Sequence, residues 1–280
     1  MSKFMKKSNP ALPFIVIALV IGIVALAIYF FVKKSDKKET DQENPAQVVN
    51  PSGLDKDKKI SDVEGVEEVV AKWIEANPQA IINSVSNMQK KAMEEQMKNA
   101  QKNIGEKKSD LFNDKKTPQH APSGYDVTIV EFYDYACGYC KKAYSTVNEL
   151  IKSDKKVRVI FRDFPILGQP SREMAEVSVA VNLVDSSNFI KFHDNLMESN
   201  DRGKDAAFKA VKSAGINVSK VEEVLKKDKA KIDKILEENL NLGTSIGING
   251  TPGFVIGEEL IPGALELAVL KEKISAQRKK

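Results

Sequence analysis

The sequence predicts an α/β fold in which two buried strands pair in parallel. Residues 127–135 (VTIVEFYDY) and 156–166 (KVRVIFRDFPI) are rich in β-branched and aromatic side chains, as buried strands are. Between them, residues 141–153 carry apolar side chains at helical spacing. A strand, a helix and a second strand form the unit expected for parallel pairing, so a globular domain should begin near residue 125.

An uncharged apolar segment, residues 11–32, lies close to the N-terminus. A run of this length can cross a hydrocarbon core of about 30 Å as a helix. We therefore expect a single-pass membrane anchor after a short tail at residues 1–10. The alternative is a cleaved secretory signal that releases the protein, because Ala25 and Ala27 would suit a cleavage site. The apolar run continues beyond them, however, which favours the uncleaved anchor.

Residues 33–60 are rich in Lys, Asp, Pro and Asn, and they predict a flexible linker. Lysines stand on both sides of the apolar segment, so their distribution does not fix its orientation. The whole chain has 43 Lys and Arg against 39 Asp and Glu, with both signs interspersed. No basic stripe is interleaved with aromatic residues, so we expect no nucleic-acid partner.

Residues 61–104 predict two helices that meet at Asn77–Pro78, where Asn77 can cap the second helix and Pro78 suits its first position. The second helix has one apolar stripe, formed by Ile81, Val85, Met88, Ala92, Met93 and Met97. This stripe packs either on the globular domain of its own chain or on a second copy, as coiled-coil seams do. We favour the second alternative, a helical oligomerisation segment. Residues 105–124 return to loop composition.

The rest of the chain predicts a mostly helical tract followed by a small β element. Residues 167–247 have helical periodicity throughout. Residues 248–263 read as two short strands with turns, and residues 264–276 as a closing helix.

The chain has two cysteines, Cys137 and Cys140, in the sequence CGYC. Where a strand turns into a helix, Cys137 would lie at the helix N-terminus, which stabilises a thiolate. Cys140 would follow one turn later on the same face, close enough to close a small disulfide ring. We expect the more exposed Cys137 to attack substrates and the more buried Cys140 to resolve the mixed disulfide.

Other uses of the two thiols are less well supported. A disulfide across so small a loop removes little chain entropy and would stabilise the fold weakly. A zinc site lacks ligands, because the other soft candidates are His120 and His193, with no second C-x-x-C motif. A holdase or a copper-handling module remains an alternative, since Cu(I) accepts two thiolates. For exchange chemistry we expect no metal and no organic cofactor, because the cysteine pair itself carries the electrons.

Two further features bear on the chemistry. Glu131 precedes Cys137 by six residues, at a strand position expected to face inward. Burial would raise the pKa of its carboxyl, which could then relay a proton for Cys140; an outward-facing strand residue is the alternative. Thr251–Pro252, in the sequence GTPGF, is suited to a cis bond, although only about 5–6% of X–Pro bonds are cis.

Residues 125–278 resemble the thioredoxin superfamily and, within it, the DsbA-type thiol–disulfide oxidoreductases of the bacterial periplasm. The resemblance is carried by EFYDYACGYC and by GTPGF after a helical tract. It implies a thioredoxin fold with a helical domain inserted at about 167–247. It also implies that Cys137 is the nucleophile, Cys140 the resolving cysteine and Glu131 a buried proton relay.

The same resemblance implies a substrate groove beside the cysteines, lined by Thr251 and a cis Pro252. The motif dipeptide, Gly138 and Tyr139, is expected to contact substrate and to tune the redox potential. Gly-Tyr replaces the Pro-His of the best-studied oxidases, so the resemblance leaves open whether the enzyme acts as an oxidase or as an isomerase or reductase.

The segment VAKWIEANPQAIINSVSNMQKKAMEEQ resembles the N-terminal oligomerising part of a DsbA subgroup with dimeric and trimeric members. The resemblance further implies exported protein substrates with thiols or disulfides, and a membrane redox partner, either DsbB-like and oxidising or DsbD-like and reducing. A dithiol–disulfide enzyme belongs where disulfides persist. We therefore expect an inner-membrane protein whose N-terminus is cytoplasmic and whose catalytic domain lies in the periplasm or outside the cell.

Overall fold

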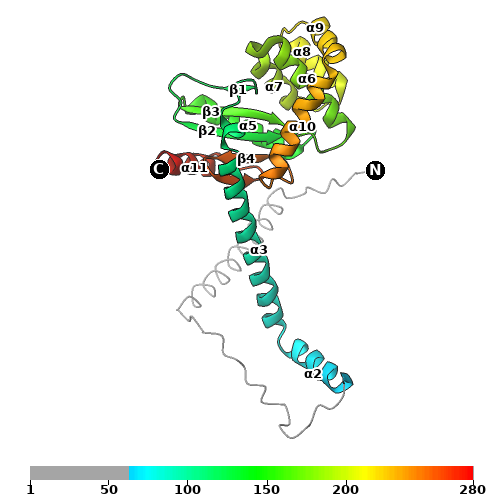
Figure 1. The fold of residues 1–280 in the computed structure, drawn as a ribbon, viewed down its shortest axis with the longest axis vertical. Coiled ribbons are helices and arrows are strands. Elements are labelled where there is room, and N and C mark those ends of the chain that lie inside the picture. The colour runs from blue at the N-terminus through cyan, green and yellow to red at the C-terminus, as the bar shows by residue number, and fades with distance from the viewer. Residues whose placement is uncertain (1–62, 280) are drawn as a thin grey trace, which may run out of the picture. The chain divides into compact units, whose positions relative to one another are not determined.

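A mixed sheet of five strands, in the order β1-β3-β2-β4-β5, organises the C-terminal part of the chain (Figure 1). The structure is a computed structural model that describes residues 63–279. The strands are β1 (Gln119–His120), β2 (Val127–Tyr133), β3 (Val157–Asp163), β4 (Gly253–Ile256) and β5 (Glu259–Pro262). β2 and β3 are parallel, as predicted, and the other neighbouring strands pair antiparallel.

Helices precede, connect and follow these strands. They are α2 (Val63–Ala76), α3 (Pro78–Glu106), α4 (Lys108–Phe112), α5 (Gly138–Ser153), α6 (Gln169–Asp185), α7 (Phe189–Glu198), α8 (Lys204–Ser213), α9 (Val218–Lys227), α10 (Lys229–Ser245) and α11 (Leu267–Arg278), with a 3-10 turn at Ser186–Asn188. α5 is the crossover between β2 and β3. α6 to α10 lie between β3 and β4, which confirms the predicted helical insertion.

Both faces of the sheet are buried. Along β2, the alternation of side chains sends Ile129 and Tyr133 into one core cluster and Val130 and Phe132 into the other. The first cluster includes apolar residues of α5, α6, α7 and α11. The second is built from the end of α3, from α4 and from α10. The sheet is therefore a central layer between two helical layers.

The region 105–124, predicted as a loop, has more secondary structure than expected. It contains the end of α3, the short helix α4 and the edge strand β1. Leu111, like Ile104 just before this region, is fully buried in the second core cluster. The prediction was wrong because a few isolated apolar residues among many polar ones carry no periodicity that reveals their burial.

The ends of the two central strands also differ from the prediction. β2 stops at Tyr133 and β3 stops at Asp163, earlier than the apolar runs 127–135 and 156–166 indicate. Beyond the ladder, the Phe164 N–H donates to the Tyr133 carbonyl at 2.7 Å. The chain then leaves the sheet after both strands, so that two loops meet at their carboxyl ends.

α3 changes character along its length. Near its end, Ala100 and Ile104 are buried. Upstream, Met88, Met93 and Met97 are 64%, 63% and 55% exposed. Among the described residues, the globular domain therefore does not cover these three methionines of the predicted apolar stripe.

Within residues 63–279, no helix has both the length and the apolar character needed to cross a bilayer. The predicted tail, anchor and linker (1–10, 11–32 and 33–60) lie outside the described residues.

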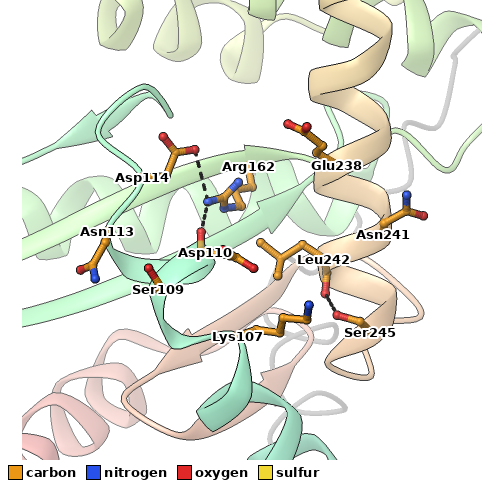
Figure 2. A pocket seen from close by; sticks show the side chains of 10 residues that line it. All are labelled: Lys107, Ser109, Asp110, Asn113, Asp114, Arg162, Glu238, Asn241, Leu242 and Ser245. Carbon is orange, nitrogen blue, oxygen red and sulfur yellow. Dashed lines mark hydrogen bonds and ion pairs between the residues drawn. The ribbon is translucent and has the colours of Figure 1, made fainter.

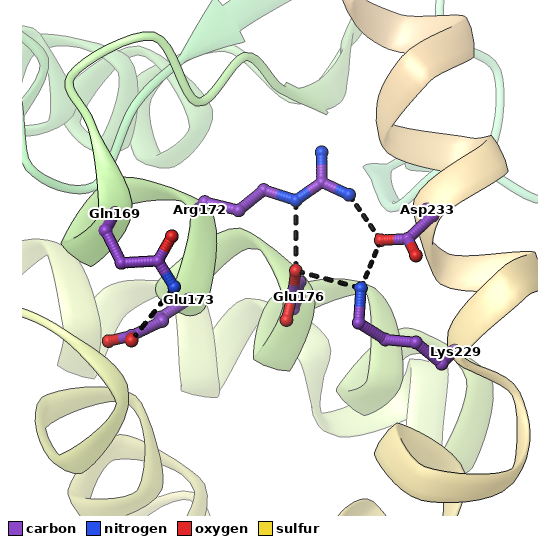
Figure 3. Close-up of polar contacts among 6 residues, drawn as sticks. All are labelled: Gln169, Arg172, Glu173, Glu176, Lys229 and Asp233. Atoms are coloured by element: carbon purple, nitrogen blue, oxygen red, sulfur yellow. Dashed lines mark hydrogen bonds and ion pairs between the residues drawn. The ribbon is translucent and has the colours of Figure 1, made fainter.

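Four charged side chains tie the start of α6 to α10 (Figure 3). Arg172 Nε lies 3.0 Å from Glu176 Oε1, and a second guanidinium nitrogen contacts Asp233. Lys229 Nζ lies 3.4 Å from the same Glu176 oxygen and 2.5 Å from Asp233 Oδ1. Because the four side chains are partly exposed, we expect them to fix the position of α6 more than to add stability.

Candidate active site

The turn after β2 places Cys137 at the N-cap of α5. Its backbone is extended (φ −82°, ψ 119°), and its N–H donates to the Asp134 carbonyl at 3.0 Å. The Lys141 N–H donates to the Cys137 carbonyl at 3.2 Å, which starts the helix. First-turn N–H groups lack intrahelical partners, so a helix N-terminus favours negative charge at this point. Cys137 is therefore where the sequence predicted it.

Cys140 lies in the first turn of α5 and is enclosed more fully than Cys137. Its residue exposure is 0%, against 7% for Cys137. Burial raises the pKa of the Cys140 thiol, and a hydrogen bond from the Asp134 N–H to its Sγ, at 3.5 Å, opposes that shift. Both cysteines are free thiols in the structure. Cys140 thus keeps its proton more firmly than an ordinary cysteine.

The structure brings Thr251 next to Cys137, across 114 residues of sequence. The Cys137 Sγ lies 3.3 Å from the Thr251 carbonyl oxygen, to which the thiol can donate. The Thr251–Pro252 peptide bond is cis, as the sequence suggested. Pro252 is buried, and its carbonyl accepts from the Gly263 N–H at 2.8 Å. The Pro252 carbonyl is thus used inside the fold, whereas the Thr251 carbonyl faces the sulfur.

Glu131 points into the core from the middle of β2. It is 1% exposed, and in the ladders it stands opposite Phe161 and Phe254. Burial raises the pKa of its carboxyl to about 8, and its Oε1 has no hydrogen-bond partner among the described residues. A charge on Glu131 also raises the pKa of Cys140, so the two groups lie within electrostatic range. The predicted inward orientation is confirmed, and the carboxyl can hold a proton near neutral pH.

Exposed apolar side chains accompany the cysteine pair. Gly138 and Tyr139 are both exposed, and Tyr139 is 70% exposed. Ile166 and Leu167, in the loop after β3, are 41% and 50% exposed. Their N–H groups bond to the Asp134 carboxylate, which places this loop beside the turn that carries Cys137. We call Tyr139, Ile166 and Leu167 the apolar rim.

Sequence reasoning missed Asp134 and the loop at Ile166–Leu167. Asp134 is 2% exposed and lies in the turn between β2 and Cys137. The available signal was an acidic residue directly after an apolar strand and just before the cysteine motif. Burial of a carboxylate at such a position requires several hydrogen-bond donors, and those donors could not be located from the sequence.

The two histidines considered as zinc ligands do not form a metal site in the described residues. His193 is buried against aromatic rings, and its Nδ1 lies 3.0 Å from the Tyr135 hydroxyl. Burial lowers the pKa of His193 to about 3, so the ring is neutral. His120 lies in the edge strand β1. Between residues 63 and 279, no group of three or more His, Cys, Asp or Glu side chains could hold a metal ion.

A cavity of about 700 Å³ surrounds Arg162, between α4 and α10, and none of the predicted site residues lines it (Figure 2). Arg162 Nη1 donates to Asn239 Oδ1 at 2.8 Å, and Nη2 donates to the Asp110 carbonyl. Asp114 Oδ2 lies 3.6 Å from Nη2. The buried guanidinium joins α10 to the α4 region, and we assign it a structural role.

Solved structures of other proteins share this fold. α-DsbA2, a thiol–disulfide exchange protein from Wolbachia pipientis, is 30% identical, with a TM-score of 0.59 over 63% of this chain and 95% of its own. The catalytic domain of Proteus mirabilis ScsC is 27% identical, with a TM-score of 0.59 over 64% of this chain and 99% of its own. Salmonella enterica Typhimurium BcfH, 21% identical, shares the fold with a TM-score of 0.65 over 77% of this chain and 95% of its own.

Among curated proteins, no sequence matches the chain significantly. The family profile of the DSBA-like thioredoxin domain matches residues 128–275, which span β2, the cysteine pair, the helical insertion and most of α11. The chain therefore belongs to the family of DsbA-like thioredoxin domains, whose members are thiol–disulfide oxidoreductases.

Proposed function

We propose that this protein exchanges disulfides with exported proteins, and that Cys137 is its nucleophile. The observation that carries the proposal is the 3.3 Å contact between the Cys137 Sγ and the Thr251 carbonyl, at the start of α5. A substrate chain lying against Thr251 and Pro252 would present its sulfur to Cys137. Gly138 and Tyr139, exposed between the two cysteines, would contact the same chain.

In the oxidising direction, a substrate thiolate attacks the Sγ of Cys137 in the Cys137–Cys140 disulfide, and Cys140 leaves as a thiolate. A second substrate thiolate then attacks the mixed disulfide, and Cys137 leaves as a thiolate. Two electrons pass from the substrate to the cysteine pair. In the reducing direction, the Cys137 thiolate attacks a substrate disulfide, and Cys140 resolves the mixed disulfide.

Glu131 supplies and accepts the proton that these steps require at Cys140. When Cys140 leaves, the Glu131 carboxyl protonates its thiolate; when Cys140 attacks, the Glu131 carboxylate takes the thiol proton. A pKa of about 8 supports this role, because such a group exchanges protons readily near neutral pH. The burial of both groups supports a transfer shielded from bulk water.

Disulfide exchange with exported proteins requires an oxidising compartment, so we place the catalytic domain in the periplasm or at the cell exterior. Residues 11–32 would anchor it in the inner membrane, with the N-terminus in the cytoplasm. A membrane redox protein, DsbB-like or DsbD-like, would return the cysteine pair to its working state.

We further propose that copies of the chain associate through the apolar stripe of α3. The exposed Val85 and Met88 support this, since no other described residue of the chain buries them. The double substitution Val85→Glu with Met88→Glu should reduce the protein to a monomer in light-scattering measurements. The control is Asn87→Glu, which adds charge at an exposed polar position of the same helix. A wild-type protein that is itself monomeric would refute the proposal.

The exchange activity is tested by insulin reduction. Cys137→Ser should lose all activity above the background of dithiothreitol alone, while its far-UV circular dichroism stays unchanged. A metal assay on the purified protein tests the alternative of a copper-handling module. Stoichiometric copper without exchange activity would overturn the enzyme proposal.

The net direction follows from the reduction potential of the cysteine pair, measured against glutathione. Every 30 mV corresponds to about 1.4 kcal/mol for this two-electron couple. A potential near that of strong oxidants would support disulfide formation with a DsbB-like partner. A potential well below that of glutathione would support net reduction with a DsbD-like partner.

A further inference from the structure

We propose that Asp134 is a positioning residue for the resolving step: it holds the turn before Cys137 so that the sulfur of Cys140 faces the mixed disulfide. This inference rests on the proposed exchange function. It goes beyond that function because it proposes that the Asp134 carboxylate, which takes no part in the exchange chemistry, sets the position of the Cys140 sulfur.

The backbone of Asp134 contacts both cysteines. Its N–H donates to the Cys140 Sγ at 3.5 Å, and its carbonyl accepts from the Cys137 N–H at 3.0 Å. Burial raises the pKa of the Cys140 thiol, and the hydrogen bond from the Asp134 N–H partly offsets this rise. The orientation of one peptide unit therefore affects how readily Cys140 becomes the attacking thiolate.

The side chain of Asp134 fixes that backbone by accepting four hydrogen bonds. Oδ1 accepts from the Ala136 N–H at 2.8 Å, within the turn itself. Oδ2 accepts from the N–H groups of Ile166 and Leu167, at 2.9 Å and 3.2 Å, and from the Ser171 hydroxyl. The carboxylate thus joins the turn before Cys137 to the loop after β3 and to the first turn of α6.

Only an acceptor with two oxygens fits this set of partners. Both oxygens of Asp134 face donors, so an amide in its place would direct an N–H group at one or more of them. Asp134 forms no ion pair with any described Lys, Arg or His, so its position depends on the directions of these hydrogen bonds. Replacing one oxygen by NH₂ should release at least one of the three segments that the carboxylate joins.

The step that this arrangement serves is the resolution of a mixed disulfide on Cys137. The Cys140 thiol gives its proton to Glu131, and the sulfur electron pair forms a bond to the Cys137 Sγ. The bond between Cys137 and the substrate sulfur breaks, and the substrate sulfur leaves as a thiolate. If the turn is loosened, the first attack by Cys137 should continue, whereas resolution by Cys140 should slow.

The test separates the two steps with a small aromatic disulfide whose thiol product is coloured. Mixed with the reduced full-length protein in stopped flow, this reagent releases one thiol when Cys137 attacks and a second when Cys140 resolves. Asp134→Asn should leave the first phase within about twofold of wild type and slow the second about tenfold, as expected when one or two charge-assisted hydrogen bonds are lost. A second phase at the wild-type rate, or equal slowing of both phases, would overturn the proposal.

If Asp134→Asn does not fold, two serine variants on α6 can still test whether the hydrogen bonds to Asp134 affect the second phase. Ser171→Ala removes one donor to Asp134 and should slow the second phase about twofold to threefold. Ser178→Ala removes a hydroxyl equally buried and bonded to a different carboxylate, Asp163, at 3.0 Å, and should leave the second phase unchanged. Equal rates in the two serine variants would overturn the role of Asp134. If the wild type itself shows no second phase, both the role of Asp134 and the proposed exchange function are overturned.

Discussion

The surroundings of Cys137 and Cys140 differ although the two residues share one helical turn. Cys137 stands at the open side of the site, beside the Thr251 carbonyl and the exposed Tyr139. Cys140 has no exposed surface and lies within electrostatic range of the buried Glu131. Under the proposed exchange function, substrate contact and proton handling would therefore lie on separate sides of the same site. Variants on the two sides should therefore have separable effects.

The largest effect on the buried side should come from removing its thiol. In Cys140→Ser, Cys137 should still attack a substrate disulfide, but no second thiol can resolve the product. The mixed disulfide should live at least about a hundredfold longer than in wild type, because an intramolecular thiol acts at high effective concentration. Non-reducing gels with mass spectrometry would detect the trapped species. A mixed disulfide as short-lived as in wild type would remove the distinction between the two cysteines.

A smaller effect concerns the stability of the buried side and its dependence on pH. The pKa of Glu131 is about 8 in the folded protein and 4.5 as the ordinary value, so the folded state binds a proton that the unfolded state has lost between these pH values. The stabilising contribution is complete below pH 4.5 and declines as the pH rises towards 8. Between about pH 5 and pH 7 the wild type should lose roughly 2–3 kcal/mol of unfolding free energy through this group.

Glu131→Gln should abolish that part of the pH dependence, as measured by urea denaturation at both pH values. Asp163 supplies a residual slope of the same sign, because burial raises its pKa from 3.8 to about 7. Asp163→Asn is therefore the matched control, which should retain the Glu131 contribution. Parallel stability curves for wild type and Glu131→Gln would contradict the assignment of a buried, protonated carboxyl to this position.

The smallest effect should come from the apolar rim on the open side. Leu167→Ser should raise the KM for an unfolded protein substrate about fivefold, since a partly buried leucine contributes on the order of 1 kcal/mol. The reaction with a small disulfide reagent should not change, because such a reagent has no chain to lie on the rim. Val269→Ser alters an exposed apolar residue on α11 and serves as the control. If both substitutions raise the KM equally, the rim has no special part in substrate contact.

Local sequence patterns were sufficient for the parts of the site that are close in the chain. The apolar run before the cysteines placed β2, and the strand-to-helix transition placed Cys137 at the start of α5. The inward direction of Glu131 followed from its position in that strand. Each of these features depends on neighbours within a few residues, which is the range over which periodicity and capping carry information.

Contacts between distant segments could not be predicted from periodicity. The approach of Thr251 to Cys137 was anticipated through the family resemblance alone, because 114 residues separate them. The hydrogen bonds that Asp134 accepts from Ile166 and Leu167 were not anticipated, since nothing in either segment marks the other as its partner. The short elements α4 and β1 were missed because each depends on tertiary packing more than on its own pattern.

The buried end of α3 has a consequence for how assembled copies would work. Ile104 belongs to the core cluster on one face of the sheet, whereas Cys137 and Cys140 belong to the cluster on the other face. The end of α3 therefore attaches to the face of the sheet that does not carry the two sulfurs. If copies associate as proposed, each chain would bring its own Cys137–Cys140 pair, so several pairs could act on different bonds of one misfolded client at the same time.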